Sequence, residues 1–226
     1  LIFGEWVTGK HSMNGDGTVI TGDGDDFIYM DRVLGTEASG NVTILTGDGN
    51  DVIVAKNGAI ANGSYINMGE GDNRFDIYGN ATNNLEGRMG DGNNAIEARE
   101  GNIGGTFVFG NGDNTFAVDG SVVSNSVITT GDGDNSLSIA GNLLGLVDTG
   151  NGDNSVYLAG NLEAGSHIRT GSGDDTIYIG GTINGNVDAG AGDDLVVMTS
   201  ASQGWGWWGV SVHGRAGMDT PVSYTH

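Results

Sequence analysis

A glycine-containing motif repeats through most of this chain at a nearly constant interval. The string Gly-x-Gly-[Asp/Asn]-[Asp/Asn]-x-apolar-x-apolar occurs nine times, with copies 19 to 25 residues apart. Its first glycines are Gly22, Gly47, Gly69, Gly90, Gly110, Gly131, Gly150, Gly171 and Gly190. Such periods are typical of solenoids, in which each repeat is one supersecondary unit stacked on its neighbours. The sequence therefore predicts a repeat architecture.

Apolar residues alternate in steps of two within each repeat, as in Ile28 and Met30 or Ile177 and Ile179. A second apolar column lies three residues before the first glycines: Val19, Ile44, Ile66, Phe107, Ile128, Val147, Ile168 and Val187, with Gly87 as the exception. A step of two is the periodicity of a β-strand. Each repeat is therefore expected to hold two short strands, separated by the glycine turn and by a second turn.

Stacking such units pairs each strand with its equivalent in the next repeat, and the two apolar columns then face each other across a thin core. We expect an all-β fold, a parallel β-solenoid of about nine coils with one Gly/Asp-rich edge and capped ends. The predicted divisions are an N-terminal cap at 1–14, the solenoid at 15–199 and a Trp-rich cap or docking segment at 200–226. Glycine interrupts every candidate helix.

Composition and charge exclude several classes of protein. The chain has 44 glycines but 1 proline and no cysteine, so neither collagen nor a disulfide scaffold fits. Its 29 acidic and 8 basic residues give a net charge of −21, which argues against nucleic acid or an anionic membrane as a partner. No apolar stretch is long enough for a transmembrane segment.

The acidic residues are concentrated in the motif. Sixteen of the 29 occupy its second, fourth or fifth position, and no basic residue lies in its first five positions. Stacking would align these carboxylates, and two of them about 5 Å apart repel by roughly 3 kcal/mol at an effective dielectric of 20. A cation between the turns would relieve this repulsion. Carboxylates and turn carbonyls suit calcium, whereas zinc and copper lack suitably spaced ligands.

The segment Gly171-Ser172-Gly173-Asp174-Asp175-Thr176-Ile177-Tyr178-Ile179 resembles the repeats-in-toxin (RTX, hemolysin-type) calcium-binding repeat. Its longer unit is similar to the 19-residue form found in bacterial surface adhesins. The resemblance implies a secreted bacterial protein, extracellular or at the cell surface, that folds with Ca²⁺. It also implies ligation by the fifth motif residue and by carbonyls of the glycine turn. The implied metal residues are Asp26, Asp51, Asn73, Asn94, Asn114, Asn135, Asn154, Asp175, Asp194, Gly22, Gly24, Gly47, Gly49, Gly171, Gly173, Gly190 and Gly192.

The fifth motif position departs from the family pattern in the middle of the chain. It is aspartate in the first two and last two motifs but asparagine in the five between them. Asparagine offers a neutral oxygen or a stacked amide. We therefore expect calcium to bind best near the two ends of the rod.

Three kinds of function follow as hypotheses. The first is an extracellular rod that serves as a filament, surface-layer or adhesin component and self-associates through its ends. The second is binding of ice or of a glycan surface, although Thr130, Thr149 and Thr170 are expected to face the corner interior. The third is catalysis, but an enzyme is not expected, because the acids belong to the repeat and no nucleophile or phosphate-binding motif occurs.

Overall fold

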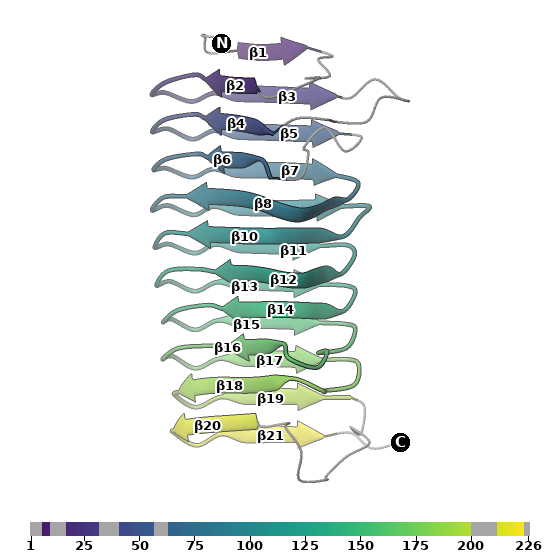
Figure 1. Cartoon of the computed structure of the whole chain (residues 1–226). Coiled ribbons are helices and arrows are strands. Elements are labelled where there is room, and N and C mark those ends of the chain that lie inside the picture. Colours follow the sequence, from purple (N-terminus) through teal and green to yellow (C-terminus); the bar gives the residue numbers. More distant parts are fainter. Residues whose placement is uncertain (1–5, 10–16, 32–40, 57–62, 200–211, 224–226) are drawn as a thin grey trace.

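The computed structural model describes residues 6–9, 17–31, 41–56, 63–199 and 212–223. Two parallel sheets stack face to face along the whole length of a rod (Figure 1). The 11-stranded sheet consists of β1 (Trp6–Gly9), β3 (Phe27–Asp31), β5 (Val52–Lys56), β7 (Arg74–Tyr78), β9 (Ala95–Arg99), β11 (Thr115–Val118), β13 (Ser136–Ile139), β15 (Ser155–Leu158), β17 (Thr176–Ile179), β19 (Leu195–Met198) and β21 (Thr220–Ser223). The 10-stranded sheet consists of β2 (Gly17–Ile20), β4 (Val42–Leu45), β6 (Tyr65–Asn67), β8 (Ala81–Met89), β10 (Ile103–Phe109), β12 (Val122–Thr129), β14 (Leu143–Asp148), β16 (His167–Arg169), β18 (Asn186–Ala191) and β20 (Val212–Ala216).

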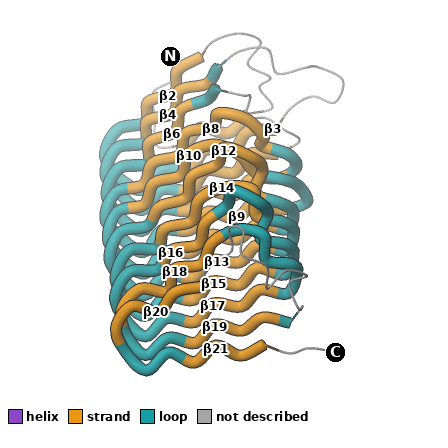
Figure 2. Tube along the Cα trace, turned by 60° about the horizontal axis from the view of Figure 1, so that its bottom comes forward, coloured by secondary structure: helices purple, strands orange, loops and turns teal. Residues whose placement is uncertain are grey.

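The chain alternates between the two sheets at every step. Each strand inside a sheet pairs with the strands two before and two after it, always in parallel, as in Ser136↔Ser155 and Ser155↔Thr176. No helix occurs among the described residues. The predicted all-β parallel solenoid is confirmed, and Figure 2 shows the stacked coils in an oblique view.

The core is a single layer of side chains between the sheets. Both apolar columns are buried, and Phe107 of β10 meets Phe116 of β11 across the layer at a ring-centroid distance of 5.6 Å. Gly87, where the second column is broken, lies beneath Phe107, whose Cδ1 is 3.1 Å from where a Cβ would stand. The Phe107 side chain thus fills the space left by Gly87 in the preceding coil.

Paired strands extend into both segments expected to close the rod. Strand β1 pairs with β3, and β20 and β21 pair with β18 and β19, so the sheets reach beyond residues 15–199. The N–H of Thr220 donates to Asp194 O, so the backbone nitrogen of the next residue, Pro221, faces the opposite side, which is the free edge of the sheet. Proline has no N–H, so it is tolerated at an edge. The three clustered tryptophans, Trp205, Trp207 and Trp208, lie outside the described residues.

Candidate functional site

The nine Gly-x-Gly turns stack along one edge of the rod, which we call the glycine edge. Each of them joins an even-numbered strand to the following odd-numbered strand, at the left of Figure 1. Repeated glycine is needed because the turns stack closely. At Gly133, for example, φ is +137° and a Cβ would stand 2.4 Å from the carbonyl oxygen of Gly112 in the preceding coil.

The fifth motif residues form a buried column inside the glycine edge, here called the inner column. All nine are at most 4% exposed: Asp26, Asp51, Asn73, Asn94, Asn114, Asn135, Asn154, Asp175 and Asp194. The backbone N–H of each residue donates to Oδ1 of the next member, at distances such as 3.0 Å from Asn94 N to Asn114 Oδ1. The predicted metal residues therefore do align from coil to coil.

In the five asparagine turns, the side-chain NH₂ group donates to two carbonyls of its own turn, while Oδ1 accepts the N–H of the preceding coil. Nδ2 of Asn114 donates to the carbonyl oxygens of Gly110 and Gly112 at 3.1 and 2.8 Å. Asn73, Asn94, Asn135 and Asn154 make the equivalent pair of bonds. An NH₂ group thus fills the centre of each central turn, and its partners are all acceptors.

The aspartate turns lack this donor. Oδ2 of Asp26, Asp51, Asp175 and Asp194 is buried without a hydrogen-bond partner. Oδ1 of Asp51, Asp175 and Asp194 accepts the bond from the preceding coil, so Oδ2 takes the place that Nδ2 has in an asparagine turn. An unpaired buried carboxylate oxygen beside turn carbonyls is an all-acceptor environment. Such an environment requires a cation or a proton.

These residues fit calcium by the chemistry of their oxygens. Within the described residues, no group of three or more His, Cys, Asp or Glu side chains is arranged to hold a metal. A site here would instead combine one or two carboxylates with backbone carbonyls: Gly22 and Gly24 with Asp26, Gly47 and Gly49 with Asp51, Gly171 and Gly173 with Asp175, and Gly190 and Gly192 with Asp194. Calcium accepts such mixed oxygen ligands.

Burial raises the pKa of Asp51, Asp175 and Asp194 above the ordinary aspartate value. At Asp51, the Thr46 hydroxyl opposes the shift without cancelling it, and the charge of Asp26 adds to it. Neither Thr46 Oγ1 nor Asp51 Oδ2 forms a hydrogen bond of acceptable geometry. The carboxylate is therefore poorly stabilised in the metal-free fold.

The direction of these pKa shifts predicts the pH dependence of metal-free stability. A carboxyl whose pKa is higher in the folded state stabilises the fold below the unfolded value of about 3.9, and that contribution disappears as the pH rises through the folded pKa. In calcium-free buffer, we expect the thermal midpoint to rise as the pH is lowered from neutral toward about 4.5. Scanning calorimetry measures this, with an Asp51→Asn, Asp175→Asn, Asp194→Asn triple variant as the control that should respond less. A midpoint that falls on acidification would contradict the assignment.

The structure adds one residue that the motif search did not identify. Asp219 continues the inner column, because the N–H of Asp194 points at its Oδ1 at 3.4 Å. Gly217 stacks on Gly192 with a φ of +146°, so this turn repeats the glycine geometry although its first glycine is missing. The sequence signal for this turn was the tripeptide Gly217-Met218-Asp219, whose glycine follows Gly192 by 25 residues. Two aspartates therefore follow each other in the inner column at three places: Asp26 and Asp51, Asp175 and Asp194, and Asp194 and Asp219.

The second and fourth motif residues form two exposed columns, here called the outer columns. Their hydrogen bonds run in the opposite direction to those of the inner column. The N–H of Asp134 donates to Asp113 Oδ1 at 2.9 Å, and Asp153 and Asp174 continue the series at 2.8 Å. Peptide N–H groups thus stabilise these carboxylates, which are also exposed to solvent, whereas the carboxylates of the inner column are buried.

The aligned threonines also lie at the glycine edge. Thr130, Thr149 and Thr170 are 8%, 0% and 2% exposed, and the Thr130 and Thr170 hydroxyls donate to carbonyls of the next coil. The prediction that they face the corner interior is confirmed. They cannot form an ice-binding lattice.

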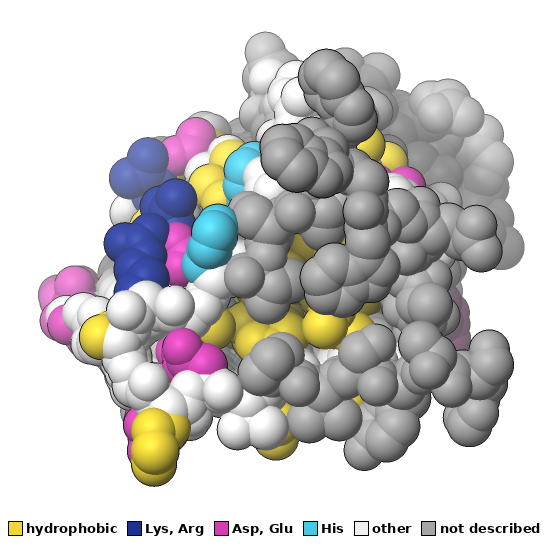
Figure 3. Space-filling view, turned by 90° about the horizontal axis from the view of Figure 1, so that it is seen from below, with side chains coloured by type: hydrophobic (Ala, Val, Ile, Leu, Met, Phe, Trp, Pro, Cys, Tyr) yellow, Lys and Arg dark blue, Asp and Glu magenta, His cyan; other side chains and the backbone are white. Residues whose placement is uncertain are grey.

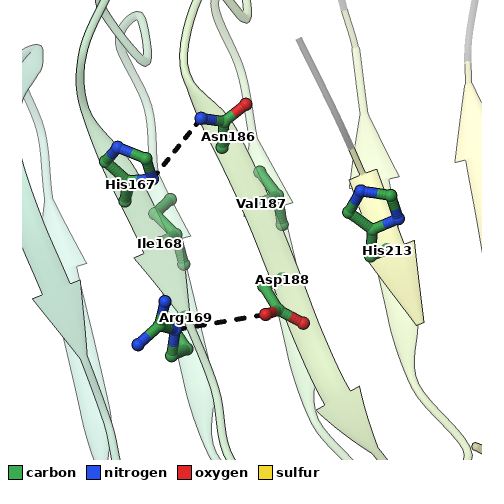
Figure 4. Close-up of a pocket in the computed structure, with 7 residues that line it drawn as sticks. All are labelled: His167, Ile168, Arg169, Asn186, Val187, Asp188 and His213. Carbon is green, nitrogen blue, oxygen red and sulfur yellow. Dashed lines mark hydrogen bonds and ion pairs between the residues drawn. The ribbon is translucent and has the colours of Figure 1, made fainter. Parts of the chain in front are cut away.

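A separate pocket of about 190 Å³ lies on the outer face of the 10-stranded sheet (Figure 4). His167 on β16 and His213 on β20 border it, with β18 between them, and Asn186 Nδ2 lies 3.4 Å from His167 Nδ1. Asp188 pairs with Arg215, and Arg169 is 4.0 Å away. Figure 3 shows basic side chains beside the histidines at this end. The histidines are two strand spacings apart, about 9.6 Å, and are also offset by two residues along the strands, which argues against a shared ion.

Comparison of the chain with protein-family models, with curated proteins and with solved structures gives no match. In the part of the chain that the structure describes, no helix has the length and apolar character needed to cross a membrane. Function therefore has to be argued from the glycine edge itself.

Proposed function

We propose that this chain is a secreted, calcium-stabilised structural rod that serves as an extracellular component of a filament, surface layer or adhesin. The proposal depends on the four orphaned Oδ2 atoms of the inner column. Calcium would neutralise these carboxylates and hold turn carbonyls that have no NH₂ partner. This is the role that the resemblance to RTX repeats implies.

The distribution of the aspartates supports metal-dependent ends and a metal-independent centre. The aspartate turns are the first two and the last two, and the five turns between them carry asparagine. Each central NH₂ group already donates to two carbonyls, as at Asn94 with 2.9 Å to both Gly90 and Gly92. Calcium would thus stabilise the two regions where each sheet has a free edge.

The composition of the sites favours an extracellular setting. Each candidate site offers one or two carboxylates. A site with few charged ligands binds calcium more weakly than a site with many. Sites of this kind match extracellular modules, whose dissociation constants are about 10⁻⁴ to 10⁻³ M. The absence of cysteine imposes no redox requirement.

Self-association through the ends is disfavoured by the edge strand β21. Head-to-tail growth would pair β21 of one copy with β1 of the next. Pro221, directed toward that edge, lacks one of the N–H groups that such pairing needs. We therefore expect that the chain does not polymerise by itself through pairing of β21 with β1, and calcium-dependent filaments of the purified chain in electron micrographs would contradict this.

Hydrogen exchange with and without calcium tests the proposal. We expect calcium to increase protection at residues 22–26, 47–51, 171–175 and 190–194, while residues 90–94 and 110–114 change little. Titration against a chelating dye should show binding near four sites, matching the four orphaned carboxylates. Equal binding at all turns, or an ordered fold that EDTA leaves unchanged, would refute the proposal.

A further inference from the structure

The outer face of the 11-stranded sheet is divided into a charged half and an uncharged half. Each strand from β3 to β9 carries at least one outward charged side chain, and those of β7 and β9 form ion pairs, such as Arg74 with Asp76 and with Glu97 at 3.0 Å each. From β11 to β19, none of the ten outward side chains is charged. We call this second area the neutral strip. On a chain with a net charge of −21, an uncharged area five strands long is unexpected.

Two stacked tyrosines stand on the neutral strip. The rings of Tyr157 and Tyr178 are 4.8 Å apart and 8° from parallel. Tyr157 is 46% exposed, which makes it one of the few large apolar side chains exposed in the described chain. Because Ser138 is its neighbour on the side away from Tyr178, the second face of the Tyr157 ring is open above a small residue.

Exposed hydroxyl groups lie beside the tyrosines on the same face of the sheet. Ser136, Ser138 and Ser155 are exposed, and their hydroxyls make no hydrogen bond with the described residues. Ser136 and Ser155 are paired neighbours on adjacent strands, about 4.8 Å apart, and Ser138 lies two residues further along β13. An open aromatic face next to a row of free hydroxyls matches a sugar ring, which has C–H groups on its face and hydroxyls around its rim.

The size of the neutral strip argues against a second copy as its occupant. Five strands of four residues cover roughly 24 by 13 Å, or about 300 Å². A stable interface needs about 800 Å² per partner. Two rods of charge −21 would also repel each other. An extended chain molecule fits this narrow area better.

The charges around the neutral strip select among polysaccharides. The outer column that includes Asp134, Asp153 and Asp174 runs beside it, two residues from Ser136, Ser155 and Thr176. Carboxylates repel an anionic polymer and accept hydrogen bonds from sugar hydroxyls. We propose that the neutral strip binds an uncharged polysaccharide, with a sugar ring against the open face of Tyr157 and its hydroxyls over Ser138.

Pull-down of the calcium-loaded chain on insoluble cellulose and chitin tests this proposal, and affinity electrophoresis in soluble xylan and in alginate measures selectivity. Binding to an uncharged polymer should weaken at least about tenfold in Tyr157→Ala and in Ser138→Asp. Tyr65→Ala, which removes a tyrosine from the other sheet, should bind as the unmodified chain does. Circular dichroism of each variant checks that the fold is retained.

Several results would overturn the proposal. The first is that the chain binds no uncharged polymer, and the second is that it binds alginate alone. The third is that folded Tyr157→Ala and Ser138→Asp variants bind as strongly as the unmodified chain. Growth-arrested ice crystals without polysaccharide binding would identify ice as the ligand instead. A dimer that Tyr157→Ala dissociates would identify a second copy.

Discussion

Asn114→Asp should destabilise the calcium-free rod by about 3 to 5 kcal/mol, the cost of an uncompensated buried charge. The change is isosteric and the site is 1% exposed. It removes the donor to the Gly110 and Gly112 carbonyls and places a carboxylate among acceptors. Calcium should recover much of this loss, because the substitution creates the environment found at Asp51. Urea unfolding with and without millimolar calcium measures both effects.

Two further variants separate this effect from a general effect of added charge. Asn93→Asp makes the same change in an outer column, where the residue is exposed and its Oδ1 accepts the Asp113 N–H, so its cost should stay within about 0.5 kcal/mol. Asp175→Asn supplies the missing NH₂ group and should stabilise the calcium-free protein while removing one calcium site. If Asn114→Asp costs no more than Asn93→Asp, the inner column does not exclude unpaired charge.

Gly133→Ala should cost more than about 3 kcal/mol or prevent folding. Its Cβ would lie 2.4 Å from Gly112 O and 2.6 Å from Gly112 C, and both of these are backbone atoms held by the neighbouring coil. The strand pairing on both sides prevents the coils from separating at one turn. Thermal unfolding and the size of the particle report the loss.

Gly24→Ala is the matched control for Gly133→Ala. Gly24 has a comparable φ of +115°, but no described atom lies within 4 Å of its added Cβ. Its expected cost is the left-handed strain alone, about 1 to 2 kcal/mol. Equal losses in the two variants would mean that coil stacking does not require glycine at this edge.

The fold could be predicted because its determinants are local. Alternation within a repeat decides which residues face inward, and Ile28, Phe116 and Ile177 are buried as that alternation requires. The period then leaves stacking as the only way to cover both apolar columns. Prediction was less complete at the C-terminal end, where a missing first glycine concealed the turn that contains Asp219.

The candidate site could be predicted only in part. The alignment of the fifth motif residues followed from the period, but the partner of each side-chain atom did not. Whether Nδ2 of Asn94 contacts glycine carbonyls depends on its rotamer and on the turn around it. Likewise, the spacing did not reveal that a peptide N–H of the next coil donates to the outer-column carboxylates.

The sequence by itself therefore determined the solenoid, its two apolar columns and the division between aspartate turns and asparagine turns, since these depend on spacing and residue type along the chain. Only the tertiary structure decided which oxygens are left unpaired, which way each hydrogen-bonded column runs and where the uncharged face lies. These properties arise between residues about one coil apart, and they depend on side-chain direction and on the register with which one coil rests on the next.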